Sequence, residues 1–241
     1  MPVKIRYTVS LAFLLLISAC DNKNIKSSNN HSDELDVYLN KIKSELIYIK
    51  GGEFLMGDYG EEYGPENLPY DSNKDSKPLH KVELSSFSIS KFKLSNKLYQ
   101  YYIAINKLNL ERNGLGPSNT RYWDELNITQ DTPAHVDWYE ANKYCTWLAG
   151  VTKLPFSLPT EAQWEFAARN RGEYVIAPTN DGTIRADQGD KSNVASEKDS
   201  KLYAEKMGTS LGVFSPLPGN LYPPNPLGIY DMAGNGYEWM K

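Results

Sequence analysis

The sequence has few of the residues that carry thiol and imidazole chemistry. It contains two cysteines and three histidines, so it cannot build the disulfide framework of a small secreted domain. It also lacks a basic excess, because 26 lysines and arginines stand against 30 aspartates and glutamates. Nucleic-acid binding requires clustered positive charge. The composition therefore excludes a disulfide scaffold and predicts no nucleic-acid partner.

An apolar run long enough to cross a bilayer is missing from the N-terminus. Residues 11–17 are apolar, well short of the roughly 20 residues that a spanning helix needs. They follow Lys4 and Arg6 and precede small residues, which is the order of a secretory signal. The segment I-S-A-C, which ends at Cys20, resembles the bacterial lipobox. We therefore predict a lipoprotein signal peptide over residues 1–19 and lipidation of Cys20; an ordinary signal peptide with a chance cysteine is the alternative.

The residues after the cysteine indicate where the chain resides. Asp21 resembles the inner-membrane retention signal of enteric-type lipoproteins. We expect a cell-envelope protein that a lipid holds to the membrane on the periplasmic side, with Asp21 indicating the inner membrane. Residues 20–45 are mostly polar and bury too little surface to offset the entropy of ordering, so a tether is predicted. Within it, residues 35–46 have the apolar spacing of a short helix.

Residues 46–241 have ordinary globular character, in a chain that is 40% hydrophobic and 23% charged. With 17 glycines, 14 prolines and 17 tyrosines, a loop-rich architecture is expected. Strands are predicted at residues 47–49, at residues 53–56 as the returning strand of a hairpin, and across residues 80–90. Residues 107–131 and 170–218 have no periodicity and are predicted to be irregular.

Three helices are predicted from their first residues. Each begins after a Ser, Asp or Thr that can cap the helix N-terminus, followed by apolar residues at helical spacing. The caps are Ser95 before residues 96–106, Asp137 with Glu140 before a helix that Gly150 ends, and Thr160 with Gln163 before residues 161–169. Together with the strands they predict an α+β fold.

Six motifs, in order along residues 49–239, resemble the formylglycine-generating-enzyme (sulfatase-modifying factor) domain, a variant of the C-type-lectin-like fold. The motifs are I-K-G-G-E-F-L-M-G (49–57), which resembles the opening hairpin of the family, K-P-L-H-K-V (77–82), K-L-S-N (93–96), P-A-H-V-D-W (133–138), L-P-T-E-A-Q-W-E-F-A-A-R (158–169) and G-I-Y-D-M-A-G-N-G-Y-E-W (228–239). The resemblance implies one such domain over residues 46–241, incomplete at its C-terminus.

Enzymes of this family oxidise a cysteine of a client sulfatase to formylglycine, with copper held by two cysteines. Those cysteines lie beyond the last motif, near an R-G-G-S-W/F segment, and neither feature occurs before Lys241. The resemblance therefore does not support copper in this chain. We expect an accessory or binding role towards a protein partner. A fragment of a formylglycine-generating oxidase is the alternative.

Calcium is the cofactor that the resemblance leaves open. Family members hold structural calcium with asparagine side chains, backbone carbonyls and a glutamate, and loop oxygens suit this ion. The matching positions are Asn235, Gly236 (carbonyl) and Glu238, with Asn193 and Val194 (carbonyl) as a weaker match. The alternative is that Asn235 and Glu238 only brace their loop by hydrogen bonds.

Other candidate residues favour structural roles. Cys145 lies on the second predicted helix, where a lone cysteine is typical of a core position. Glu161 and Glu165 are four residues apart on one helix face, and a paired-carboxylate site is conceivable. We expect instead that Glu161 supports the helix N-terminus and that Glu165 bonds a buried backbone group or Arg169.

The histidines give no metal motif. Sulfoxide synthases of the same superfamily bind iron through H-x-x-x-H-x-E, and His31, His80 and His135 do not have that spacing. We therefore expect structural roles for His80 and His135 and no iron.

Overall fold

The computed structural model describes residues 22–109 and 117–241. The predicted signal peptide, Cys20 and Asp21 lie outside the described residues. Among the residues that are described, no helix combines the length and the apolar character needed to cross a membrane.

The predicted helix at residues 35–46 is part of a longer one. Helix α1 spans Asn22–Ser44, and Leu46 already belongs to the first strand. The chain divides into two compact units after Leu39, so most of α1 is described by itself. The fold that follows is that of residues 40–241.

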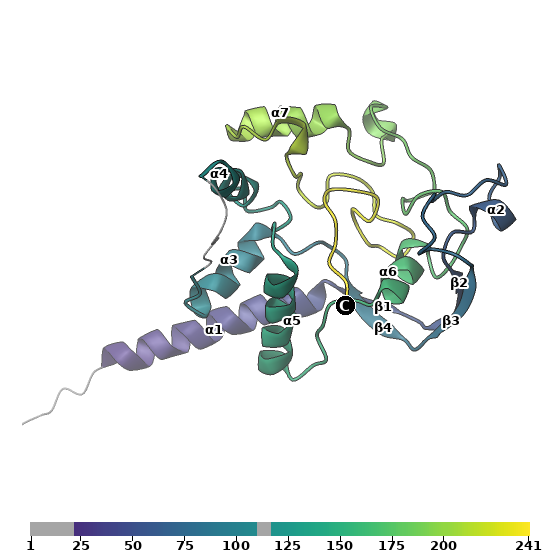
Figure 1. Cartoon of the computed structure of the whole chain (residues 1–241). Coiled ribbons are helices and arrows are strands. Elements are labelled where there is room, and N and C mark those ends of the chain that lie inside the picture. Colours follow the sequence, from purple (N-terminus) through teal and green to yellow (C-terminus); the bar gives the residue numbers. More distant parts are fainter. Residues whose placement is uncertain (1–21, 110–116) are drawn as a thin grey trace, which may run out of the picture. The chain divides into compact units, whose positions relative to one another are not determined.

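Two antiparallel ladders form the strand region. Strand β1 (Leu46–Ile49) pairs with β4 (Phe87–Ser90), and β2 (Gly52–Met56) pairs with β3 (His80–Leu84). The prediction of a hairpin between residues 47–49 and 53–56 is therefore wrong. Strands β1 and β2 do not pair with each other but follow one another on the same side of the paired strands. The register continues across the break: Ile49 lies opposite Phe87 and Gly52 opposite Leu84. The two ladders form one bent ribbon, seen beside α6 in Figure 1.

Gly51 makes the break in the ribbon possible. A Cβ atom at this position would lie 2.1 Å from the Leu84 carbonyl oxygen and 2.6 Å from the Ser85 carbonyl carbon. The Gly51 N–H instead bonds the Ser86 hydroxyl at 3.1 Å. The glycine is thus needed for close backbone approach, which is one of the main uses of this residue type.

The three capped helices are confirmed. They are α3 (Asn96–Ile105), α5 (Trp138–Thr152) and α6 (Glu161–Ala168), and the capping boxes of α5 and α6 are both formed. The predicted end of the second helix is wrong. Helix α5 runs through Gly150, and Lys153 caps its C-terminus in a left-handed conformation. An isolated glycine inside a helix destabilises it by about 0.5–1 kcal/mol relative to alanine, which packing can offset.

Two segments predicted to be irregular contain helices. Helix α4 (Pro117–Leu126) lies within residues 107–131, and α7 (Glu197–Met207) lies within residues 170–218. Helix α7 buries only Ala204, so it shows no apolar stripe, and its capping box pairs Ser196 with Asp199. The short helices α2 (Gly60–Tyr63), η1 (Gly189–Lys191) and η2 (Gly212–Phe214) complete the described elements.

The main core joins the ribbon, helix α6 and the C-terminal loop. Its buried members come from all three: Ile49, Phe54, Phe166, Ala167, Ala168, Ile229 and Met232. A second cluster, Leu126, Ala204 and Leu211, packs α4 against α7 and the segment after it. Ile229 and Met232 thus anchor the loop at residues 228–239 in the main core.

Candidate functional site

The C-terminal loop is held in a strained but well-bonded path. Gly228, Asp231, Asn235 and Gly236 all have positive φ angles, from 57° to 97°. The buried Asn225 accepts from the Ile229 N–H at 3.0 Å and donates to the Ala167 carbonyl at 3.0 Å. Asn225 lies outside the recognised motifs and was not among the predicted site residues. These turns and hydrogen bonds fix the backbone that carries the side chains of the candidate site.

The last residues are fastened to the start of α5. The Trp138 indole N–H donates to the Met240 carbonyl at 2.8 Å, and the Trp239 indole N–H donates to the Val136 carbonyl at 2.8 Å. The Lys241 N–H bonds the Pro159 carbonyl at 2.9 Å. These bonds hold residues 235–239 in place, and those residues line one side of the cavity described below.

Asn235 braces the loop. Its Oδ1 accepts from the Leu217 N–H at 2.9 Å, and its Nδ2 donates to the Leu217 carbonyl and to Asp231 Oδ2, both at 2.8 Å. The side chain therefore joins two loops through a two-way bond with one backbone residue. The bracing hydrogen bonds expected as the alternative to calcium are present at this position.

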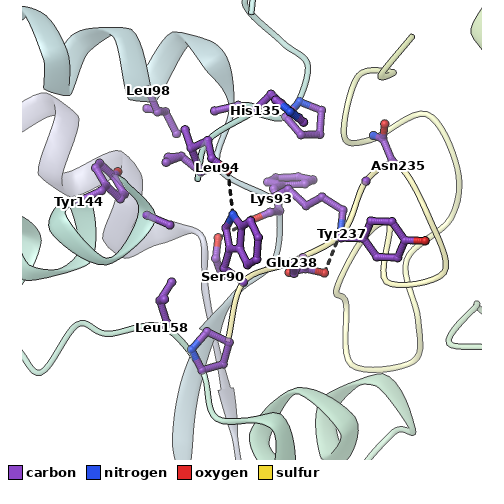
Figure 2. Close-up of a pocket in the computed structure, with 18 of the residues that line it drawn as sticks. Ser90, Lys93, Leu94, Leu98, His135, Tyr144, Leu158, Asn235, Tyr237 and Glu238 are labelled. Carbon is purple, nitrogen blue, oxygen red and sulfur yellow. Dashed lines mark hydrogen bonds and ion pairs between the residues drawn. The ribbon is translucent and has the colours of Figure 1, made fainter. Parts of the chain in front are cut away.

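Glu238 is engaged by a cation and an indole. Its Oε1 accepts from Lys93 Nζ at 2.7 Å and from Trp164 Nε1 at 3.1 Å, as Figure 2 shows for Lys93. The Lys93 side chain is only 8% exposed. Lys93 was not singled out from the sequence. An ammonium group this close competes directly with any cation at the same carboxylate oxygen.

Asn193 and Val194 lie beside Asn235 at a small cavity of about 80 Å³, which Asp231 also lines. Asn193 Oδ1 accepts from the Arg185 N–H at 2.7 Å, and its amide donates to Asn180 and to the Thr183 carbonyl. The structure therefore brings together three of the five predicted positions. Gly236 and Glu238 line a different, larger cavity, together with Asn235.

Asp231 lies within the motif at residues 228–239 but was not among the predicted calcium ligands. Burial raises its pKa above the usual 3.8, although the Asn235 hydrogen bond and the charge of Lys93 act in the opposite direction. The raised pKa means that the hydrogen bond and the charge of Lys93 do not fully offset the cost of burying the ionised carboxylate. Together with the loop oxygens of Asn193, Val194 and Asn235, this carboxylate fits the ligand types of calcium.

The donor set is nevertheless poor in ionisable ligands. Among the described residues, no group of three His, Cys, Asp or Glu side chains is placed to hold a metal ion. A calcium site here would depend on amide and backbone oxygens around a single carboxylate. Calcium at these residues stays a prediction.

Cys145 is a partly buried thiol on α5. Burial raises its pKa to about 11, with the charge of Lys241 acting against this. Because the thiolate is the form that attacks and binds metals, Cys145 is a poor nucleophile at neutral pH. This agrees with the expectation of a packing role.

The structural interpretation of Glu165 is confirmed. Its Oε1 accepts from the Gly57 N–H at 3.0 Å and from Arg169 Nη1 at 2.6 Å. Arg169 also donates to the Leu55 carbonyl at 2.9 Å. Glu165 therefore fastens α6 to the end of β2.

The two histidines with described side chains lie apart. His80 Nδ1 lies 3.2 Å from the Pro78 carbonyl oxygen at the start of β3. The His135 ring stands edge-on to Trp123, with centroids 4.4 Å apart. Neither belongs to a metal-binding group among the described residues.

A cavity of about 1290 Å³ lies between β4, helices α3 and α5, and the C-terminal loop. Figure 2 shows Leu94, Leu98, Tyr144 and Leu158 among its lining residues, together with the paired Lys93 and Glu238. Its lining is mainly apolar, and this cavity is called the groove below.

The groove runs along the edge of β4. All five of residues 86–90 line it, whereas alternate side chains of a strand point to opposite faces. A cavity in contact with every residue therefore lies at the edge. Strand β4 uses its other edge to pair with β1, and no further strand pairs with it among the described residues. Such an edge offers unpaired backbone groups to an added strand.

The fold and this loop-built site define the class of protein: a loop-rich α+β domain of the formylglycine-generating-enzyme kind. The family described as "Sulfatase-modifying factor enzyme 1-like domain" matches residues 38–241. The chain belongs to this family.

Curated relatives of the chain carry different names. The formylglycine-generating enzyme of Thermomonospora curvata is 28% identical over 236 residues, which cover 83% of this chain and 71% of the enzyme. The "Inactive C-alpha-formylglycine-generating enzyme 2" of Mus musculus is 25% identical, over 80% of this chain and 67% of that protein. "Serine/threonine-protein kinase pkn1" of Chlamydia pneumoniae is 26% identical over 83% of this chain, which spans only 28% of its length.

Solved structures agree on the fold. PvdO from Pseudomonas aeruginosa superposes with a TM-score of 0.55 at 24% identity, over 81% of this chain and 69% of that chain. Treponema denticola variable protein 1 superposes with a TM-score of 0.50 at 18% identity, over 81% and 71%. The predicted fold, an α+β variant of the C-type-lectin-like fold, is therefore confirmed.

Proposed function

We propose that this protein is a binding or accessory member of its family. The observation that supports this most is the groove, an apolar space of about 1290 Å³ beside the open edge of β4. Addition of an extended segment to a free strand edge is a common mode of peptide recognition, with side chains placed in neighbouring pockets. Leu94, Leu98 and Leu148 line the groove as such pockets would.

The state of the thiol in the groove agrees with a binding role. Cys145 lines the groove, and its pKa of about 11 keeps it protonated at neutral pH. The groove thus supplies apolar surface and backbone hydrogen-bonding groups, and the thiol adds to its apolar surface.

Strand addition makes a test possible that uses the backbone alone. The probe is a solubilised peptide of alternating Val and Thr, and the control is the same sequence N-methylated at alternate residues. We expect calorimetric binding of the first peptide and at least tenfold weaker binding of the second, because N-methyl groups cannot donate to β4. Equal affinity for the two peptides would contradict strand addition, and so would the absence of binding by either peptide.

The second candidate function is that of a formylglycine-generating oxidase acting on a cysteine of a client sulfatase. It is favoured by the similarity to the Thermomonospora curvata enzyme over 83% of this chain. The described residues offer one thiol, Cys145, and its pKa opposes metal binding at neutral pH. The binding role is therefore preferred.

We also propose that the protein is a lipoprotein of the cell envelope. The support comes from the basic, apolar and small residues that precede Cys20. Lipidation at Cys20 would anchor the domain through residues 20–45, and Asp21 favours the inner membrane on its periplasmic side.

A further inference from the structure

A second exposed surface joins the loop between β2 and β3 to the segment that follows α6, and none of its residues lines the groove. It consists of Tyr63, Tyr70 and Tyr174, which are 49%, 45% and 44% exposed. Tyr63 and Tyr174 are stacked, with centroids 4.5 Å apart and planes within 4°. Large rings left exposed together are unusual on a protein that needs them only for packing, and they often mark interaction sites. These three residues are called the tyrosine surface.

The tyrosine surface is supported from below. The buried Tyr59 contacts Tyr70 and Tyr174 with ring centroids 5.3 and 5.0 Å apart, and its hydroxyl donates to the Val175 carbonyl. The Arg169 guanidinium lies 4.5 Å from the Tyr59 ring centre and 5.4 Å from that of Tyr174. The exposed rings therefore sit on a packed layer, and ordering them on binding costs little entropy.

The loop itself is fixed by Asp58. Its carboxylate accepts from the N–H groups of Gly60 at 2.9 Å, Tyr70 at 3.2 Å and Asp71 at 2.9 Å. These bonds set the positions of α2 and of Tyr70 together. The tyrosine surface is thus a preformed feature of the fold.

Exposed carboxylates border the rings. Glu61 and Glu62 lie on α2 next to Tyr63, and both are exposed. Burial raises the pKa of the Tyr174 hydroxyl, and Tyr63 and the negative charge of Glu62 raise it further, whereas the charge of Arg169 lowers it. The cation under the layer, Arg169, is already paired with Glu165 at 2.6 Å. The charged side chains that α2 exposes next to Tyr63 are both negative.

Rings and carboxylates side by side are complementary to a cation. The face of a tyrosine ring attracts Lys and Arg side chains, and a neighbouring carboxylate adds an ion pair. We propose that the tyrosine surface, with Glu61 and Glu62, docks a Lys- or Arg-rich extended segment of a partner protein. A neutral sugar would use the rings but would not need the two carboxylates, so the charge pattern favours the basic segment.

The probe for this proposal is a peptide of alternating Arg and Gly, and its binding is measured by fluorescence anisotropy at low and physiological salt. We expect saturable binding that weakens at least fivefold in the double variant Tyr63→Ala/Tyr174→Ala, although its net charge is unchanged. Glu61→Gln/Glu62→Gln should weaken binding by a similar factor. Tyr63→Phe keeps the ring face and should bind like the unmodified protein.

Matched controls separate this surface from general attraction to an acidic protein. Glu83→Gln/Glu205→Gln removes the same charge at exposed positions elsewhere, and Tyr139→Ala removes a tyrosine that is 70% exposed on α5. Both controls should bind the peptide as tightly as the unmodified protein. The proposal is overturned if the controls weaken binding equally, if no variant weakens it, or if a maltooligosaccharide binds instead. Circular dichroism of each variant verifies folding.

Discussion

Asp58 shows how one carboxylate can organise a long loop. Three backbone N–H groups bond it, and Lys77 Nζ lies 3.6 Å away. Burial acts to raise its pKa, but the hydrogen bonds and the lysine outweigh burial, so the pKa lies below the usual 3.8. Its stabilising effect is therefore fully present above the unfolded pKa and is lost as the pH falls through the lower folded pKa.

We predict that Asp58→Asn lowers the free energy of unfolding at pH 7 by about 1–3 kcal/mol, because hydrogen bonds to a charged acceptor are lost. The difference from the unmodified protein should shrink at a pH below the folded pKa, where Asp58 is protonated in both states. Urea unfolding at the two pH values measures this. Asp190→Asn, at an exposed position, is the control. A difference that does not depend on pH would contradict the account.

The calcium prediction can be tested at Asp231 and Glu238. Asp231 shares its small cavity with Asn193 and Asn235, whereas Glu238 already accepts from Lys93. We predict that chelator-treated protein binds calcium in a calorimetric titration and that Asp231→Asn weakens binding about tenfold, or 1.4 kcal/mol. Glu238→Gln should change the affinity less than twofold.

The opposite ranking of these two variants would assign calcium to the set Asn235, Gly236 and Glu238. No binding heat and no shift in melting temperature on adding calcium would remove calcium altogether.

At the scale of elements, the strand ribbon depends on Gly51. We predict that Gly51→Ala lowers the free energy of unfolding by about 3 kcal/mol, since its Cβ would lie 2.1 Å from the Leu84 carbonyl oxygen. Gly150→Ala is the matched change inside α5, where no atom lies within 4 Å of the new Cβ. It should raise stability by about 0.5–1 kcal/mol. Denaturant midpoints compare the two, and equal effects would contradict this role of Gly51.

The sequence predicts elements well where a local signal decides them. Asp137 with Glu140 and Thr160 with Gln163 are capping boxes, which need only neighbouring residues, and both are formed. The pairing of β1 with β4 was missed because a glycine pair signals a turn locally, while the true partner lies about forty residues away.

Helix α7 was missed for a related reason. It lies on the surface and buries one small residue, Ala204, so its sequence has no apolar period. Its capping box has Asp199 in the place usually taken by Glu or Gln, and this was the signal available.

The candidate site was predictable only in part. Asn235 and Glu238 were selected from their motif, but their partners Leu217 and Lys93 are far away in the sequence. The separation of Glu238 from Asn193 depends on tertiary packing that one motif does not encode. Asp231 lies within the same motif, yet its burial is visible only in the fold.

At the scale of the whole molecule, the lipid anchor is the first prediction. Cys20→Ser in the full chain should move the protein from the membrane fraction to the soluble fraction, because the lipid is proposed to attach at that sulfur. Cys145→Ser removes the other cysteine and should leave the protein with the membrane. Immunoblots of fractionated cells measure both. Membrane retention of Cys20→Ser would contradict lipidation at this residue.

The family contains proteins named as enzymes and a protein named as inactive, so membership alone does not assign an activity. The assignment to a binding role depends on the groove and on the raised pKa of Cys145. The proposed binding role therefore predicts that the protein does not oxidise a peptide cysteine when copper is supplied.

The most direct test is an oxidation assay on a Cys-x-Pro-x-Arg peptide with copper and oxygen, followed by mass spectrometry of the peptide. The Thermomonospora curvata formylglycine-generating enzyme serves as the positive control. We predict that this protein leaves the peptide cysteine unchanged while the control converts it to formylglycine. Copper-dependent formation of formylglycine by this chain would contradict the account.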